Sequence, residues 1–132
     1  MNAGFEDCRI LDELLDEFGD DLKLCFNEYS KQRKPNADGL QDLSMQNFAV
    51  MRDGTANPKF LLQKKIEKKF ANLYPEKWIP LYTMVSFTNT PYADAWKIGM
   101  KQEKMMQSVM STPNIEEIWE SDKIMQKMCS LV

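Results

Sequence analysis

Hydrophobic positions recur at helical spacing along almost the whole chain. Apolar residues three and four positions apart form stripes, as in amphipathic helices that bury one side. The clearest stripes are Leu11, Leu14, Leu15 and Phe18; Leu22, Cys25, Phe26 and Tyr29; and Leu62, Ile66, Phe70 and Leu73. The pattern predicts a mainly α fold of about six helices, forming a single helical domain over residues 1–132.

Turn-forming residues indicate where these helices begin and end. Gly19 separates the first two stripes, and Asp20 or Asp21 can cap the second helix. Residues 34–39 read Lys-Pro-Asn-Ala-Asp-Gly, which is typical of a loop. We therefore expect a loop there, followed by a short helix over about residues 40–52.

One side of the short helix over residues 40–52 is expected to be exposed to solvent. Met45, Phe48 and Ala49 fall on one side of it at helical spacing. Asn57 and Pro58 then begin the next helix, and Pro75 closes it.

The stretch over about residues 78–88 departs from the helical pattern. It is aromatic and β-branched, and it contains Pro80. This composition favours strands, and proline is tolerated at the edge of a sheet. We expect one extended aromatic segment here, with no evident partner strand in the chain.

Two more helices are expected after this segment. One begins after Pro91 and runs to about Met110, and the last has Thr112 as its cap and Pro113 in its first turn. Many of the ten methionines lie in these helices. We interpret them as adaptable core residues, with a partner surface as the alternative.

Composition excludes several kinds of chemistry. The chain has no histidine, which excludes Ser-His and Cys-His nucleophile pairs and histidine-ligated zinc. Its acidic residues read as helix caps and helix starts, so no catalytic residue and no metal site is predicted. The three cysteines, Cys8, Cys25 and Cys129, are far apart and outside any CxxC motif. We expect free, buried thiols in a reducing cytoplasm.

Charge and hydropathy narrow the possible partners. The net charge is −3, which gives no reason to expect nucleic acid. The basic run over residues 64–69 is interpreted as a solvated helix face. No stretch approaches the roughly 20 apolar residues that a membrane span needs. We expect a cytoplasmic protein with neither a nucleic acid nor a membrane partner.

The first eight residues, Met-Asn-Ala-Gly-Phe-Glu-Asp-Cys, have the pattern of a helix start. Small residues come first, and Glu6 and Asp7 are expected in the first turn, where carboxylates stabilise the positive helix end. Such an end can offer backbone N–H groups to an electron-rich ligand. Many helices that bind nothing begin in the same way, so the residues alone leave both interpretations open.

Four separated segments together resemble a known family. They are residues 1–7, residues 42–48 with Met51 and Arg52, residues 79–87, and Tyr92 with Ala95. In this order and spacing they are similar to the C-terminal part of the FAD-dependent aromatic hydroxylases, in the group that hydroxylates L-kynurenine. The resemblance covers residues 1 to about 104 and leaves the tail from about Met105 unassigned.

This resemblance implies a monooxygenase that uses FAD and NADPH to convert L-kynurenine to 3-hydroxykynurenine, a step of tryptophan degradation. The cofactor would carry the chemistry, and the protein would position it. Met1 and Asn2 match the pair whose backbone meets the flavin ring.

The resemblance also implies substrate contacts. Asn47 and Tyr82 match an amide and a phenol that hydrogen-bond the carboxylate end of the substrate. Met51, one turn after Asn47, and Phe87 are weaker candidates for lining the pocket. Without the family, Asn47 would be interpreted as a solvated helix residue and Tyr82 as a core aromatic.

Parts of the family pattern are absent from this chain. They are the glycine-rich βαβ unit that binds the nucleotide, the arginine that binds the substrate carboxylate, and the acidic residue of the flavin motif. We therefore expect the last quarter to third of such an enzyme, without its N-terminal FAD-binding domain and inactive alone. Surfaces facing the missing domain should be apolar and exposed, and we expect them to favour self-association. The alternative is a free-standing helical interaction module derived from this region.

Overall fold

The computed structural model describes residues 2–54 and 56–132, and in this part of the chain the fold is helical without strands. This confirms the prediction of a mainly α protein. The elements are α1 (Asn2–Phe18), α2 (Leu22–Ala49), the π-helical turn η1 (Val50–Gly54), α3 (Pro58–Leu73), α4 (Leu81–Phe87), α5 (Tyr92–Met110), α6 (Ile115–Ile118) and α7 (Asp122–Leu131).

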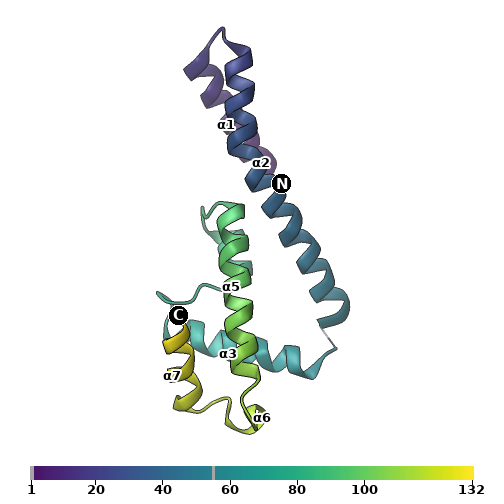
Figure 1. The fold of residues 1–132 in the computed structure, drawn as a ribbon, viewed down its shortest axis with the longest axis vertical. Helices are drawn as coiled ribbons and strands as arrows, with labels where there is room; N and C mark the ends of the chain where they lie inside the picture. The colour runs from purple at the N-terminus through teal and green to yellow at the C-terminus, as the bar shows by residue number, and fades with distance from the viewer. Residues whose placement is uncertain (1, 55) are drawn as a thin grey trace.

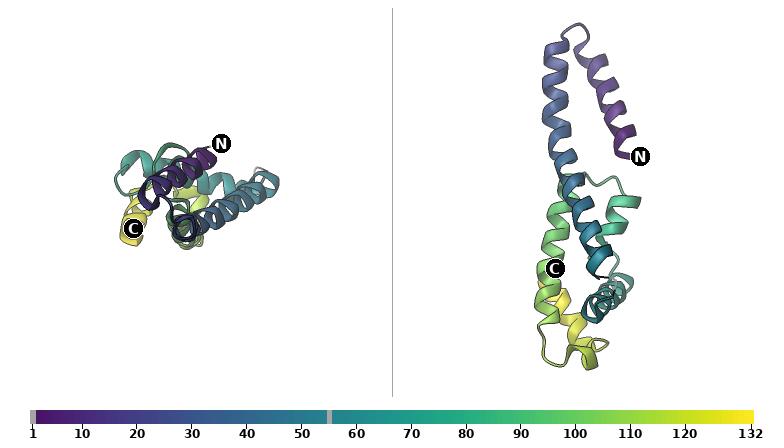
Figure 2. Two further views of the ribbon diagram at one scale, coloured as in Figure 1. Left: turned by 90° about the horizontal axis from the view of Figure 1, so that it is seen from above. Right: turned by 90° about the vertical axis from the view of Figure 1, so that its right-hand side faces the viewer.

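The molecule is elongated because α1 and α2 form a hairpin that projects beyond the other helices (Figure 1, Figure 2). Gly19 makes the turn with a φ of 51°, a conformation that glycine adopts readily. The Asp21 carboxylate then accepts a hydrogen bond from the Leu24 backbone N–H at 3.0 Å. The predicted break at Gly19 and the cap at Asp21 are both confirmed.

Arg33 holds the two helices of this hairpin together. Its side chain is only 7% exposed, and it donates to Asp7 at 2.6 Å and to Glu6 at 3.3 Å. Burial alone would lower the pKa of Arg33, but the hydrogen bond to Asp7 and the charge of Glu6 raise it. Glu6 and Asp7 lie beyond the first turn of α1, contrary to the expectation from sequence, and they pair with Arg33 instead of the helix end.

The loop expected over residues 34–39 is helical, and α2 runs through it with Pro35 inside. Two of the turn-forming residues in this stretch instead make the contact between α2 and α5. The Asn36 side-chain oxygen accepts a hydrogen bond from the Ala93 backbone N–H at 3.2 Å, at the start of α5. Gly39 is buried against the same point, where the backbones of α2 and α5 meet. Tertiary contacts therefore override the local turn preference.

The segment expected to be extended over 78–88 is also mainly helical. Only Trp78 to Pro80 and Thr88 lack helical structure, and α4 lies between them. Pro80 is the N-cap, and its carbonyl accepts from the Met84 N–H at 2.9 Å. A proline at a helix start loses no hydrogen bond, because the N–H groups there have no intrahelical acceptor. The proline signal marked the start of a helix and not the edge of a sheet.

The last predicted helix is two helices, α6 and α7. Asn114 adopts the left-handed conformation with a φ of 57°, so neither Thr112 nor Pro113 begins a helix as expected. The Lys127 ammonium stabilises this bend by donating hydrogen bonds to the Thr112 hydroxyl at 2.9 Å and to the Ser108 carbonyl at 2.8 Å. The reversal lets apolar residues of both α6 and α7 enter one core.

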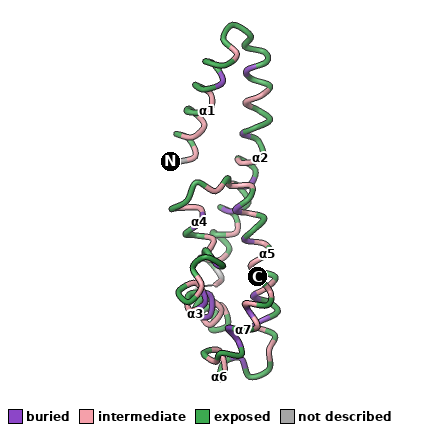
Figure 3. Tube along the Cα trace, turned by 90° about the vertical axis from the view of Figure 1, so that its left-hand side faces the viewer, coloured by how far each residue is buried: buried purple, intermediate pink, exposed green. Residues whose placement is uncertain are grey.

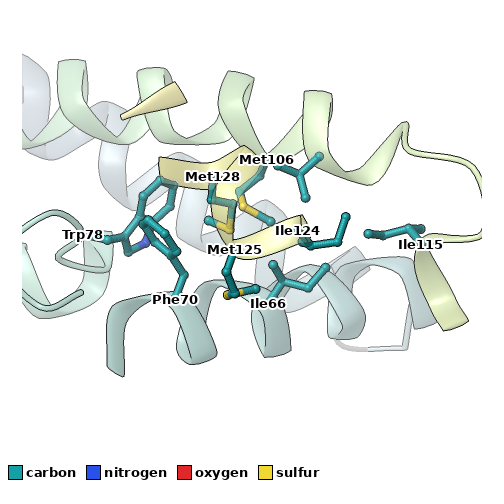
Figure 4. Packing of buried hydrophobic residues seen from close by; sticks show 9 residues of the cluster. Ile66, Phe70, Trp78, Met106, Ile115, Ile124, Met125 and Met128 are labelled. Carbon is teal, nitrogen blue, oxygen red and sulfur yellow. The ribbon is translucent and has the colours of Figure 1, made fainter. Parts of the chain in front are cut away.

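The main core lies between α3, α5, α6 and α7, at the end away from the hairpin (Figure 3). Figure 4 shows side chains of α3 and α7 pointing toward one another beneath α5. The buried members are Ile66, Phe70, Trp78, Met106, Val109, Ile115, Ile124, Met125 and Met128. Three methionines are among them, which supports the interpretation of methionines as core residues. Leu73, the last member of the predicted stripe on α3, lies outside this core and is 53% exposed.

A smaller cluster joins α2, α4 and α5. Leu43, Met84 and Ala95 are buried in it. Gly99 of α5 allows close approach of α4, because a Cβ on Gly99 would lie 2.7 Å from a methyl carbon of Leu81. This cluster fixes the position of α4 against the C-terminal half of α2. Within the described residues, no helix combines the length and apolar character that crossing a bilayer requires.

Candidate functional site

Asn47 and Tyr82, which are 35 positions apart, line the same pocket. Asn47 lies in the last turn of α2, and Tyr82 lies in the first turn of α4. We call this cavity of about 330 Å³ the α2–α4 pocket. It is lined by Leu40, Leu43, Ser44, Gln46, Asn47, Val50, Lys64, Leu81, Tyr82, Val85 and Ser86.

The α2–α4 pocket combines an apolar wall with a few polar groups, which is the usual character of a small-molecule site. Leucine and valine side chains supply the apolar part of the lining, and Asn47 and Tyr82 add an amide and a phenol. Tyr82 is 73% exposed, so it is not the core aromatic that the residues alone favoured. Together the amide and the phenol offer donors and acceptors to a polar ligand.

Met51 is placed by a contact with Asn47. The Asn47 side-chain nitrogen lies 3.8 Å from the Met51 sulfur, so the two side chains share one helical face across the junction of α2 and η1. Met51 is 64% exposed and is not among the residues that line the α2–α4 pocket. It borders the site, and its role in binding stays a prediction.

Phe87 contacts Tyr82 but opens onto a different cavity. Their ring centroids are 6.4 Å apart with an interplanar angle of 73°, an edge-to-face arrangement. Phe87 is 76% exposed. It lines a cavity of about 710 Å³ beside α1, which we call the α1 pocket, and its role in binding also stays a prediction.

The α1 pocket lies between the first turns of α1 and the connection from α4 to α5. It is lined by Phe5, Glu6, Arg9, Val85, Ser86, Phe87, Thr88, Asn89, Thr90 and Tyr92. Val85 and Ser86 also line the α2–α4 pocket, so the two cavities adjoin at α4. Of the two predicted flavin-facing residues, Asn2 belongs to this end of α1. Met1 lies outside the described residues, and Asn2 is described only as the first residue of the helix.

Lys64 of α3 is a lining residue that the sequence interpretation missed. The lysine run that contains it was interpreted as a solvated face, and most of its charges are exposed. The Lys64 ammonium lies 2.8 Å from the Glu67 carboxylate and 5.4 Å from the centre of the Phe60 ring. Its place in the run, two positions before the buried Ile66, gives no sign of the pocket.

The cysteines and acidic residues form no cluster suited to metal among the described residues, where no group of three or more potential ligands occurs. Cys25 is buried, Cys129 is partly buried and Cys8 is exposed, and all three are free thiols. The prediction of unpaired cysteines is confirmed, although Cys8 is not a core residue.

Comparison with known proteins gives the family. A curated protein from Flavobacterium psychrophilum is 52% identical to this chain over 132 residues, and relatives from Christiangramia forsetii and Flavobacterium johnsoniae are each 50% identical. Each match covers 100% of this chain and 30% of the relative. No family model matches the chain.

These relatives are monooxygenases, and the chain matches their C-terminal 30%. The three proteins carry the name kynurenine 3-monooxygenase, and over its whole length this chain belongs with the C-terminal region of that family. The match includes the tail from Met105, which the sequence resemblance had left unassigned. The chain spans about 30% of the length of these relatives.

Proposed function

We propose that this chain is the C-terminal part of a monooxygenase that hydroxylates L-kynurenine with FAD and NADPH. The observation that carries the proposal is the shared lining of the α2–α4 pocket by Asn47 and Tyr82. These are the residues for which the family resemblance implies contacts with the substrate. The relatives' shared name gives the substrate class, and we extend it to this chain.

The pocket fits an aromatic amino acid in size and character. A volume of about 330 Å³ falls at the lower end of the range typical for small-molecule sites. The apolar wall suits an aromatic ring, while the Asn47 amide and the Tyr82 phenol suit a carboxylate. Binding at these groups would fix one end of the molecule and leave its ring to be oriented by the wall.

The α1 pocket fits one edge of a flavin. Its aromatic lining residues Phe5 and Phe87 suit a flat ring, and it adjoins the α2–α4 pocket at Val85 and Ser86. When bound, FAD would supply the oxygen chemistry. The family resemblance implies that the backbone of Met1 and Asn2 would lie against the ring edge, and Asn2 is the first residue of α1.

In this proposal, the chain depends on an N-terminal domain to bind FAD. The described residues contain no β-strand on which a dinucleotide-binding βαβ unit could be built. Phe5, Tyr82 and Phe87 are 67–76% exposed, as expected of side chains that another domain covers. We infer that the complete enzyme works in the cytoplasm and that the isolated chain lacks activity and favours self-association.

A hybrid enzyme tests this proposal. The chain replaces the matching C-terminal 30% of the Flavobacterium psychrophilum relative, and product formation from L-kynurenine and NADPH is followed by chromatography. We expect FAD binding and hydroxylation by the hybrid, and neither by the isolated 132-residue chain. A hybrid that binds FAD but hydroxylates nothing would contradict the proposal and favour an interaction module. An isolated chain that retains FAD or turns over substrate would contradict the proposed dependence on a second domain.

A further inference from the structure

The α2–α4 pocket has one charged group among the described residues that line it, and that group is the Lys64 ammonium. Lys64 reaches the pocket from α3, whereas Asn47 and Tyr82 come from α2 and α4. The pocket therefore receives an amide, a phenol and an ammonium from three helices. All three groups can donate a hydrogen bond to the same kind of acceptor.

Lys64 is held near the pocket by its neighbours. Its ammonium lies 2.8 Å from Glu67 Oε2 and over the face of Phe60. Glu67 is 9% exposed and also accepts from Gln63 at 3.1 Å, so its carboxylate is a fixed anchor. An ammonium has three protons to donate, and the bond to Glu67 leaves others for a ligand.

We propose that Lys64 binds the carboxylate of the amino-acid substrate in the α2–α4 pocket, together with Asn47 and Tyr82. The inference rests on the proposed function and names a further binding residue for it. A carboxylate has two oxygens that accept several hydrogen bonds, so it can use all three groups at once. The contribution is moderate, because the Lys64 side chain is 49% exposed and Glu67 offsets part of its charge.

The test uses the hybrid enzyme with Lys64→Met and, as a matched control, Lys65→Met. Lys65 is an exposed neighbour on α3 that does not line the pocket. Lys64→Met should raise KM for L-kynurenine about tenfold, the effect of one solvent-weakened charged hydrogen bond, while kcat changes little. Lys65→Met should leave both constants unchanged, and Lys64→Arg should restore most of the lost affinity.

A second substrate separates binding of the carboxylate from general damage. For the amine that lacks the carboxylate, the unaltered hybrid and its Lys64→Met variant should have equal KM values. If Lys64→Met lowers affinity for both substrates alike, Lys64 does not bind the carboxylate. If the Lys64→Met hybrid fails to fold because Glu67 loses its cation, the double variant Lys64→Met/Glu67→Gln is compared with Glu67→Gln alone, with the same expected difference.

The outcomes for this inference and for the proposed function are distinct. An active hybrid whose KM for L-kynurenine is unaffected by Lys64→Met contradicts the role of Lys64 alone. A folded, FAD-bound hybrid without hydroxylase activity contradicts the proposed function and, with it, this inference.

Discussion

Gly39 of α2 and Ala93 of α5 meet backbone to backbone. A Cβ atom on Gly39 would lie 2.8 Å from the Ala93 nitrogen and 2.9 Å from its Cα, distances that side-chain carbons do not tolerate. Asn36, one turn earlier, accepts a hydrogen bond from the same Ala93 N–H. This crossing fixes α2 against α5, and it therefore sets the place of Asn47 relative to α4.

The first prediction concerns Gly39→Ala. In an unobstructed helix this change stabilises by about 0.5–1 kcal/mol, but here the new methyl meets backbone and forces α2 and α5 apart. We expect a net loss of about 1–3 kcal/mol in the free energy of unfolding, measured by urea titration. Gly4→Ala is the control, because its Cβ would meet nothing within 4 Å, and it should stabilise the protein. Equal effects at the two positions would show that the crossing is not tight.

The same crossing explains what could be predicted from sequence. The helical structure of the stripes, the turn at Gly19 and the cap at Asp21 depend on neighbours in the chain, and they were predicted correctly. Burial of every stripe member was not, because Leu22, Phe26 and Leu73 are exposed. Asn36 and Gly39 are turn-forming residues by local chemistry, but they make contacts with α5, more than 50 positions away. The sequence shows these residue types but not which distant residues they contact. Their local preference therefore predicts a loop where α2 continues.

Some residues of the candidate site could likewise be predicted from the sequence, and one could not. Family resemblance could mark Asn47 and Tyr82, and the pocket they share follows from the packing of α4 by Leu43, Met84 and Ala95. Lys64 could not be marked, because an exposed lysine run has the same pattern whether or not one member reaches a pocket. Only the position of α3 against α2 and α4 separates Lys64 from Lys65.

The second prediction tests the methionine core. Met106 is fully buried between α5 and α7, so Met106→Ala should cost about 2–5 kcal/mol of unfolding free energy through lost contacts and a cavity. Met45 is the same residue type but is 64% exposed, and Met45→Ala should change stability by less than about 0.5 kcal/mol. Thermal or urea unfolding of both variants measures the difference. Similar losses would contradict the placement of these two methionines.

The third prediction concerns pH. The charge of Cys129, and the hydrogen bond between its sulfur and the Tyr74 hydroxyl, raise the pKa of Tyr74 above its usual value. The unfolded chain therefore loses this proton first as pH rises. The resulting stability is fully present below the pKa of an unfolded tyrosine, about 10, and is lost as pH rises through the higher folded value.

Spectroscopic titration of tyrosinate tests this coupling, with Tyr74→Phe to identify the signal. Cys129→Ala should lower the pKa of Tyr74 toward its ordinary value by removing the largest cause of the shift. Cys8→Ala, at an exposed thiol on α1, should leave the titration unchanged. An unaltered Tyr74 titration in Cys129→Ala would exclude the pairing.

The last prediction separates the two residues of the α2–α4 pocket from their neighbour Phe87. Under the proposed function, Asn47→Ala and Tyr82→Phe in the hybrid enzyme would each remove one hydrogen bond to the substrate. Each should raise KM for L-kynurenine about 5–20-fold, corresponding to about 1–2 kcal/mol, with a smaller change in kcat. Phe87→Leu keeps an apolar side chain on the α1 pocket and should leave this KM nearly unchanged. Steady-state kinetics of the three variants provides the measurement, with bound FAD quantified to confirm that each is folded. If Phe87→Leu raised KM as much as Tyr82→Phe, the substrate would contact Phe87 as well as Tyr82, and its confinement to the α2–α4 pocket would be wrong.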